Sequence, residues 1–227
     1  AFGSGHINVV PDQDGLHRRY PIIIKLESGY VPSAPLSIFL NFNRISMKDV
    51  IIDWGNEIRI PANKENDLDI DRVIPIDEKG FAFIPYHQTW GKDFKHVFAH
   101  DFLKKINDEN LRGNWENLFQ GNFVIISDLS HGVLTDQGPT PFEKVTPLVL
   151  THVAILNGLL TNKFWREWGN QESILVFISL GLFLGISALY KNSISLYMSG
   201  AATIIFLAGF TWYQFSYFSF FPLVSIG

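Results

Sequence analysis

Cysteine is absent from the 227 residues of this chain. Disulfide bonds and thiolate metal sites are therefore excluded, while either side of a membrane remains open. The formal net charge of -4 argues against a nucleic-acid partner. The sequence also lacks a G-x-S-x-G elbow, an H-E-x-x-H pair, a Walker loop and a suitably placed G-x-G-x-x-G. It therefore indicates no catalytic residue, no metal site and no cofactor, and we expect no enzyme activity within these residues.

Charged side chains are also nearly absent from the last quarter of the chain. After Glu172 the only charged residue is Lys191. Ser173–Tyr190 and Ile194–Tyr213 are uncharged apolar runs of about 18–20 residues, the length of helix that crosses a bilayer. We predict transmembrane helices over these two runs. Burial in a globular core is the alternative, and two such runs joined only by residues 191–193 do not suit it.

The remaining boundaries follow from these runs. Residues 1–168 carry almost all of the charge and are predicted to form a soluble-type α/β domain. Residues 218–227 are again apolar and could open a third transmembrane helix. Tryptophan favours the interface between membrane and water, so the Phe164–Trp168 cluster suits the edge of a bilayer.

The predicted membrane helices say less about assembly and orientation. Gly181-x-x-x-Gly185 would allow close helix contact and a homodimer, although such glycines are common in membrane helices. Lys191 argues for a cytoplasmic turn between the helices, whereas Lys163 and Arg166 argue for the reverse orientation. Charge alone therefore does not set the topology.

The stretch Gly121–Leu160 organises the predicted domain. Phe123–Ile126 is a short, continuous apolar run rich in β-branched residues, which predicts a fully buried strand. A polar loop with two glycines and two prolines follows. From Pro147 onward apolar residues recur at three- and four-residue steps, which predicts a helix with Pro147 in its first turn. In open α/β sheets ligands bind at loops that leave the carboxyl ends of strands, so this loop is a candidate site.

Two strands and a turn are predicted near the N-terminus. His6–Val10 alternates weakly and suits a strand, and Leu16–Lys25 suits a second strand that is interrupted at Pro21. Residues 11–15, Pro-Asp-Gln-Asp-Gly, favour a plain hairpin turn. A calcium loop is the alternative, but its third acid and distal glutamate are missing. Arg18 and Arg19 would point to opposite faces of a strand, with one at a pocket, or would form a salt-bridged surface pair, which we favour.

Short-range patterns predict the other elements. Ser33–Phe42 suits a helix capped by Ser33, with Leu36, Phe39 and Leu40 buried. Residues 63–71 suit a solvated acidic loop. The remaining predictions are hairpins over residues 50–60 and 73–85, and amphipathic helices over residues 98–106 and 111–119.

Histidines flank the central loop. His131, Asp136 and His152 could form a pH-sensing or ligand-binding cluster, because an imidazole near a carboxylate titrates close to neutrality. In the plainer alternative, which the sequence favours, Asp136 accepts backbone hydrogen bonds and His152 packs on the sheet. His96 and His100 are spaced to bind zinc from one helix face, but no acid completes that site, so a surface or helix-end position is favoured.

Two motifs more than a hundred residues apart match one family. The early motif is a strand, N-x-x-P-D-x-D-G and paired arginines, matched at Asn8, Pro11, Asp12, Asp14, Gly15, Arg18 and Arg19. The late motif is a strand, a small-residue loop, an Asp, a Thr-Pro pair and a helix. Its matches are Gly121, Phe123–Ile126, Gly132, Asp136, Thr140, Pro141, Pro147, Val149, His152, Ile155, Leu156, Asn157, Leu159 and Leu160. Most of the region before Ser173 thus resembles the type-2 CHASE domain, an extracytoplasmic sensory module of membrane-bound bacterial signalling proteins.

The predicted fold is an α/β domain with a mixed sheet and flanking helices, followed by a transmembrane helical hairpin in the inner membrane. The resemblance implies that the domain lies outside the cytoplasm and that three transmembrane helices follow it. It also implies a transmembrane helix and part of the domain before Ala1, and a cytoplasmic output module after Gly227. From the loop cluster and the two motifs together, the candidate ligand-binding residues are Asp136, Thr140, His131, His152, Arg18 and Asp14. Ser127, Leu148 and Leu150 depart from the family pattern, so contacts at those positions would change or abolish the ligand.

These observations lead to three hypotheses of function. We expect a multi-pass membrane sensor that binds a small ligand or an extracytoplasmic protein and passes the signal through its helices. The second hypothesis is a membrane-anchored assembly subunit without a signalling role, which an exposed apolar patch on the domain would favour. The third is a membrane-bound hydrolase, which the missing motifs disfavour.

Overall fold

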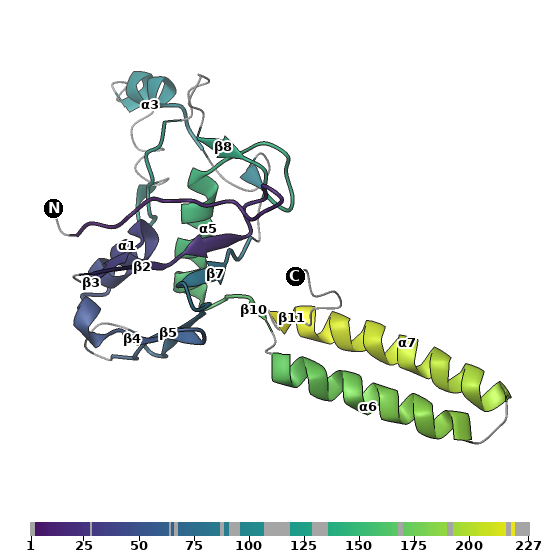
Figure 1. The fold of residues 1–227 in the computed structure, drawn as a ribbon. Helices are drawn as coiled ribbons and strands as arrows, with labels where there is room; N and C mark the ends of the chain where they lie inside the picture. The colour runs from purple at the N-terminus through teal and green to yellow at the C-terminus, as the bar shows by residue number, and fades with distance from the viewer. Residues whose placement is uncertain are drawn as a thin grey trace.

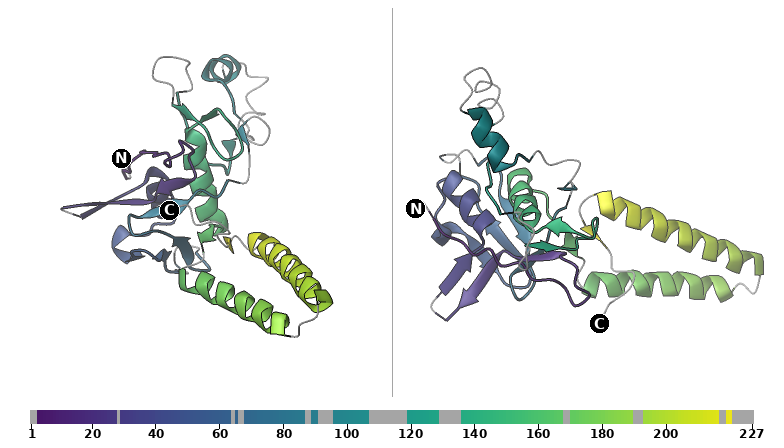
Figure 2. Two further views of the ribbon diagram at one scale, coloured as in Figure 1. Left: turned by 45° about the vertical axis from the view of Figure 1, so that its right-hand side comes forward. Right: turned by 90° about the horizontal axis from the view of Figure 1, so that it is seen from above.

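The computed structural model describes residues 3–27, 29–63, 65, 68–86, 89–90, 96–106, 119–128, 136–167, 170–189, 193–216 and 219–220. These residues form two parts (Figure 1). One is an α/β domain, and the other is a helical hairpin that projects away from it in every view (Figure 2). The division agrees with the loss of charge after Glu172.

The domain alternates short strands with a few helices. Its strands are β1 (Arg19–Pro21), β2 (Ile23–Leu26), β3 (Gly29–Pro32), β4 (Ile51–Asp53), β5 (Glu57–Ile60), β6 (Arg72–Pro75), β7 (Phe81–Phe83), β8 (Gln137–Gly138), β9 (Thr146–Pro147) and β10 (Arg166–Glu167). Its helices are α1 (Ala34–Phe42), the 3-10 helix η1 (Met47–Asp49), α3 (Ala99–Ile106) and α5 (Val149–Thr161). The rest comprises α6 (Asn170–Leu189), α7 (Ser193–Ser216) and β11 (Ser219–Phe220).

The strands form several small sheets. Antiparallel pairs join β1 to β7, β2 to β3 and β8 to β9, and an antiparallel three-stranded sheet has the order β4-β5-β6. β10 and β11 pair in parallel. The predicted α/β class is confirmed, but a single mixed sheet is wrong for the described residues. The period of two in a strand predicts which face is buried and leaves the pairing partner undetermined, because pairing depends on the whole fold.

Helices α1 and α5 pack side by side against the strands and form the core (Figure 1). The Ser33 hydroxyl accepts a hydrogen bond from the Leu36 N–H at 3.4 Å, which caps α1 as predicted. Leu36, Phe39 and Leu40 are all buried, as the spacing predicted. In α5, a Cβ on Gly158 would lie 2.7 Å from Cγ of Pro85, so this glycine allows the helix to approach the domain closely.

The predicted strand over Phe123–Ile126 is wrong. These residues are outside regular structure, and all four side chains are exposed, with Ile126 94% exposed. Burial was predicted on the assumption that neighbours cover both faces. The Phe42 ring contacts this segment, with its centroid 5.0 Å from that of Phe123.

Other short-range predictions had mixed outcomes. The 50–60 hairpin, the helix α3 and the turn at residues 12–15 are confirmed. His6–Val10 forms only an isolated bridge, between His6 and Ser33. The predicted 73–85 hairpin is wrong, because β6 pairs with β5 and β7 pairs with β1. Residues 111–118 of the other predicted helix lie outside the described residues.

The predicted helix after the central loop is confirmed, with different ends. α5 starts at Val149, and Pro147 lies in β9 opposite Gln137 instead of in the first helical turn. The helix ends at Asn162, which has left-handed backbone angles (φ 54°, ψ 41°). Asparagine tolerates this conformation better than other residues with a Cβ, so it suits a helix end.

The hairpin consists of two packed helices of 20 and 24 residues. Over the residues that the structure describes, no helix is both long enough and apolar enough to meet the criteria for a membrane span. A Cβ on Gly181 or Gly185 would meet no atom within 4 Å. These glycines therefore do not bring α6 and α7 together.

Candidate functional site

Three consecutive residues, Arg18, Arg19 and Tyr20, place charge on one side of β1 and a polar core contact on the other. Both arginines reach the carboxylate of Asp12. The Tyr20 ring is fully buried and reaches α5.

The turn before β1 positions Asp12. The Asp12 N–H donates to the Leu16 carbonyl and the Asp12 carbonyl accepts from the Gly15 N–H, both at 2.8 Å. Gly15 has φ 83°, a conformation that glycine adopts without steric cost. The turn therefore directs the Asp12 carboxylate back toward the arginines that follow it.

Arg18 holds Asp14 with two parallel hydrogen bonds. Its Nη1 and Nη2 lie 2.9 Å and 2.7 Å from the two carboxylate oxygens of Asp14, and Nη1 also lies 3.3 Å from Asp12. The hydrogen bond from Arg18 is the largest cause that lowers the pKa of Asp14 to about 2. Asp14 therefore stays ionised, and this pair lies at the surface.

Arg19 lies between two carboxylates. Its Nε and Nη2 lie 2.9 Å and 2.8 Å from Oδ1 of Asp12, and its Nη1 lies 3.6 Å from Asp77. The other oxygen of Asp77 accepts the backbone N–H groups of Lys79 and Phe81, both at 2.9 Å. Both arginines thus share Asp12, as expected for the salt-bridged pair, and Arg19 also lies beside a hollow, as in the alternative with one arginine at a pocket.

An open hollow of about 390 Å³ lies beside Arg19. Its lining combines apolar side chains with both signs of charge: Val10, Pro11, Asp12, Arg19, Asp77, Glu78, Lys79 and Phe81. A small molecule that carries both a carboxylate and an ammonium group would find a charge partner for each.

On the other side of β1, Tyr20 meets His152. The Tyr20 hydroxyl lies 2.8 Å from Nδ1 of His152 on the first turns of α5. Burial raises the pKa of Tyr20, and a hydrogen bond from Ser33 opposes that rise. Burial lowers the pKa of His152, and the charge of Asp136 opposes that fall. With the phenol protonated and the imidazole neutral, Tyr20 can donate to Nδ1.

His6 covers the Tyr20 ring. The two ring centroids lie 6.2 Å apart at an angle of 25°. Burial is the main cause that lowers the pKa of His6, and the nearby His152 lowers it further. Both ring nitrogens of His6 are buried and have no hydrogen-bond partner among the described residues. His6 is held by its backbone, which pairs with Pro32 and Ala34 at the start of α1.

The structure separates the six predicted site residues into distinct places. Asp14 and Arg18 form the surface pair, while Asp136 and His152 lie at the start of α5, with the Asp136 carbonyl accepting from the Leu148 N–H at 2.9 Å. Thr140 is buried, and its hydroxyl accepts the Glu143 N–H, so it stabilises its own turn. His131 lies outside the described residues.

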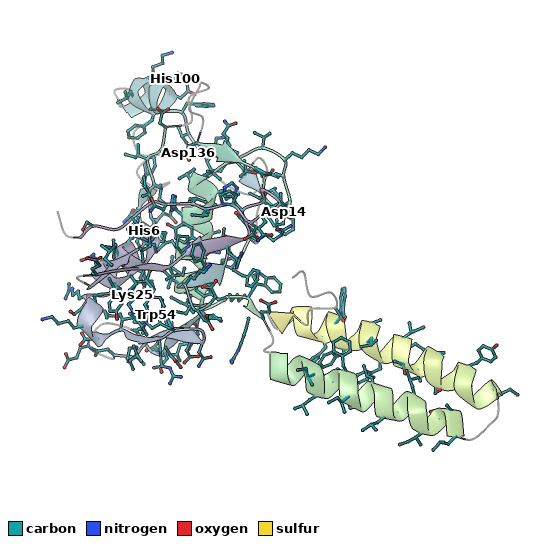
Figure 3. All side chains as sticks on the ribbon, in the orientation of Figure 1. His6, Asp14, Lys25, Trp54, His100 and Asp136 are labelled. Carbon is teal, nitrogen blue, oxygen red and sulfur yellow. The ribbon has the colours of Figure 1, made fainter. Side chains whose placement is uncertain are left out.

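Several residues of these two surroundings were missed by the predicted site. They are His6, Tyr20, Ser33, Asp77 and Lys79. The alternation of a strand, applied to Arg19 and Tyr20, would have placed a charge on one face and a phenol toward the core. His96 and His100 are exposed on or before α3, and Figure 3 places His100 at the opposite end of the domain from Trp54. The described residues contain no group of three or more His, Cys, Asp or Glu side chains that could hold a metal.

Comparison with known proteins assigns the family. A family model described as CHASE2 domain matches residues 1–187, which is most of the chain. No curated protein and no solved structure matches. The match includes both motifs and extends into α6, and it confirms the resemblance seen in the sequence. The chain belongs to the CHASE2 family, whose domain is an extracytoplasmic sensory module.

Proposed function

We propose that this chain is the input module of a membrane-bound sensor, in which a ligand at the hollow moves β1 and α5 and thereby the α6–α7 hairpin. The observation that carries this proposal is the position of β1. Arg19 lines the hollow, and the next residue, Tyr20, hydrogen-bonds to α5. One short strand therefore contacts both the candidate binding surface and the helix that leads out of the domain.

The C-terminal end of α5 supports the relay. Oδ1 of Asn162 accepts from the Val73 N–H at 3.1 Å, and its Nδ2 donates to the Asp71 carbonyl at 3.2 Å. Nε of Arg72 donates to the Leu159 carbonyl at 3.0 Å. Only residues 162–169 separate α5 from α6. Because this linker is short, a shift of α5 would also move the start of α6.

We further propose that the hairpin lies in the inner membrane, with the domain outside the cytoplasm. Large apolar side chains are exposed along both helices, among them Leu182, Ile186 and Ile205, and sticks project on all sides of the hairpin (Figure 3). Both uncharged runs have the length of a membrane span. Exposed apolar surface of this extent is stable in lipid and unfavourable in water.

The chemistry of the hollow suggests its ligand class. Arg19 and Lys79 offer positive charge, Asp77 and Glu78 offer negative charge, and Phe81 contributes an apolar wall. We propose a small zwitterion, such as an amino acid, because it would pair with both signs at once. Binding could bias the domain only by favouring one of two conformations of β1 and α5.

Spin labelling tests both binding and relay, because the chain has 0 cysteines of its own. Labels at Val145→Cys in the domain and Tyr197→Cys on α7 report the distance between the two parts in lipid nanodiscs. Each common amino acid is added singly as the probe. We expect at least one to bind and to shift this distance. Lys79→Met should weaken binding at least tenfold, whereas Lys48→Met, on the remote η1, should leave it unchanged.

The outcomes separate the parts of the proposal. Binding without a change in distance would overturn the relay, and failure of every amino acid to bind would overturn the ligand class. Membrane insertion has its own test, with a membrane-impermeant maleimide on sealed vesicles that hold the domain outside. Val145→Cys should react, and Lys191→Cys should react only after the vesicles are opened. Reaction of both in sealed vesicles would exclude the proposed topology.

A second candidate function is a membrane-anchored assembly subunit. The observation that favours it is the exposed apolar run Phe123–Ile126, which lies next to Phe42 on α1. Such a patch on a domain outside the cytoplasm suits a protein partner. A distance between the two labels that no ligand changes, together with stable association through this patch, would favour this function over the sensor.

A further inference from the structure

The residue types of the segment Phe123–Ser127 favour a strand, but among the described residues no other strand pairs with it. Phe, Val and Ile are among the residues most enriched in strands. Among the described residues, no backbone N–H or carbonyl of this segment makes a hydrogen bond. Five successive residues therefore keep their backbone donors and acceptors available, which is the situation of an edge strand.

Exposure along the segment alternates as in a strand. Phe123 and Ile125 are 39% and 38% exposed, whereas Val124 and Ile126 are 55% and 94% exposed. Phe123 contacts the Phe42 ring, so the first pair faces the domain. Side chains in a strand alternate between two faces, so Val124 and Ile126 share the outward face.

Exposed apolar side chains of α1 accompany this segment. Phe42 is 64% exposed at the end of α1, and Ile38, one turn earlier on the same helix, is 38% exposed. We call Ile38, Phe42 and Phe123–Ile126 the apolar edge. Exposed apolar patches on a soluble domain mark sites of interaction with other proteins. A standard interface buries about 800 Å² on each partner, so the apolar edge could form the centre of one.

We propose that the apolar edge is a dimer interface, in which Phe123–Ser127 of two copies pair as antiparallel strands across a twofold axis. No charged residue lies between Gly121 and Ser127, so two copies can meet without repulsion. A pairing that keeps both domain-facing surfaces on one side of the shared sheet must place one residue opposite itself. With Ile125 at the axis, Val124 lies opposite Ile126, and Asn122 lies opposite Asp128.

This register pairs like with like. The outward pair, Val124 and Ile126, is β-branched on both sides, and such cross-strand pairs stabilise sheets. Because the strands are antiparallel, the Asp128 residues of the two copies lie at opposite ends of the paired segment. The two negative charges are therefore well separated. The backbone groups of Phe123–Ser127 would gain partners from the second copy, as in strand addition at a sheet edge.

Cysteine cross-linking of the full chain in its native membrane tests the register, because no other thiol is present. Under mild oxidation, Ile125→Cys should form a disulfide between copies. Val124→Cys and Ile126→Cys should cross-link when the two variants are mixed, and less well alone. Val145→Cys is the control, since Val145 is 69% exposed outside the apolar edge. Cross-linking of Ile125→Cys no greater than that of Val145→Cys would overturn the proposal, as would cross-linking only to a different protein.

A charge variant tests the same interface without a cysteine. Ile126→Lys should abolish the dimer in sedimentation of the detergent-solubilised chain, because two lysines would meet apolar side chains of the partner. The domain should still fold, since the Ile126 side chain is 94% exposed. Val145→Lys adds the same charge elsewhere and should leave the dimer intact. A chain that is monomeric without either substitution, or a dimer that survives Ile126→Lys, would refute the pairing.

Discussion

The hydroxyl of Tyr20 lies 2.8 Å from Nδ1 of His152, although the two residues are 132 positions apart in the chain. This contact joins β1, which borders the charged hollow, to α5, which leads to the hairpin. His6 stacks on the face of the phenol ring, and Ser33 hydrogen-bonds to the Tyr20 side chain. Four segments of the domain thus meet at one buried tyrosine.

Replacement of Tyr20 by phenylalanine should destabilise the domain by about 1–3 kcal/mol, because His152 and Ser33 would lose a buried hydrogen-bond partner. The ring volume is unchanged, so packing against His6 should persist. The free energy of unfolding in urea, followed by tryptophan fluorescence of the detergent-solubilised chain, gives the effect. Tyr30→Phe is the matched control, because Tyr30 is 48% exposed and should change stability by less than about 0.5 kcal/mol.

Stability should fall as the pH falls below about 6.5. Burial lowers the pKa of both His6 and His152 from the ordinary value of 6.5, and Asp136 partly opposes the effect on His152. The unfolded state then binds protons at a higher pH than the folded state does, so protonation favours unfolding in the window below 6.5. Above that window both forms are neutral and the full stability is present.

Unfolding measured from pH 7.5 to pH 5 should show this slope. His152→Asn keeps an acceptor near Tyr20 and cannot titrate, so it should flatten the slope, and a second substitution, His6→Asn, should flatten it further. His100→Asn replaces an exposed imidazole on α3 and should leave the slope unchanged. A wild-type curve that is flat over this range, or one that His100→Asn flattens equally, would contradict the assignment.

Replacement of Asp12 by asparagine should destabilise the domain by about 1–3 kcal/mol, because its carboxylate accepts hydrogen bonds from two guanidinium groups. Its side chain is 16% exposed. Asp14→Asn should have a smaller effect, since Asp14 is 53% exposed and exposed pairs contribute little. Equal losses on the two substitutions, measured by urea unfolding, would show that Asp12 does not organise the network.

Gly158→Ala should destabilise the domain by about 1–3 kcal/mol, although alanine is the better helix former. The new Cβ would lie 2.7 Å from Pro85 Cγ and 2.9 Å from Phe164 Cζ, so α5 would have to move away from these two side chains. Asn157→Ala, one position earlier in α5, is the control and should change stability by less than about 0.5 kcal/mol. A stabilised Gly158→Ala variant would mean that α5 does not pack this closely.

Elements set by local chemistry were predictable from the sequence. Ser33 and Pro35 start α1, and the spacing of Leu36, Phe39 and Leu40 identifies its buried face before any tertiary contact is known. The same holds for the 50–60 hairpin, where Gly55 has φ 84° in the turn. Turns and helix caps depend on residues that are near one another in the chain.

Strand partners were not predictable in the same way. β7 was expected beside β6 but pairs with β1, about sixty residues earlier in the chain. Phe123–Ile126 was predicted to be a buried strand because its residue types are enriched in strands. Whether such a run is buried depends on which other segments pack against it, and the composition of the run does not show that. The contact between Tyr20 and His152 could not be predicted from the sequence either. The two residues lie on separate elements, and no local pattern connects them.

The family motif identified several residues near the candidate site but not the contacts that they make. It included Asp12, Asp14 and both arginines, and the structure gathers these residues into one ion-pair network. It offered no reason to connect Arg19 with Asp77, or His6 with His152, because those contacts depend on how β7 and the N-terminal segment cross β1.

Asn162 makes α5 and the β4-β5-β6 sheet a single stiff body at the point where the chain leaves the domain. A 13-residue helix is roughly 20 Å long. In the proposed relay, a tilt applied near Asp136 would therefore turn this body as a whole, and the chain that continues past Asn162 carries α6. The signal would then reach the hairpin as a rigid-body tilt of the domain. The direction of this tilt, and not the unfolding of a linker, would determine how α6 moves.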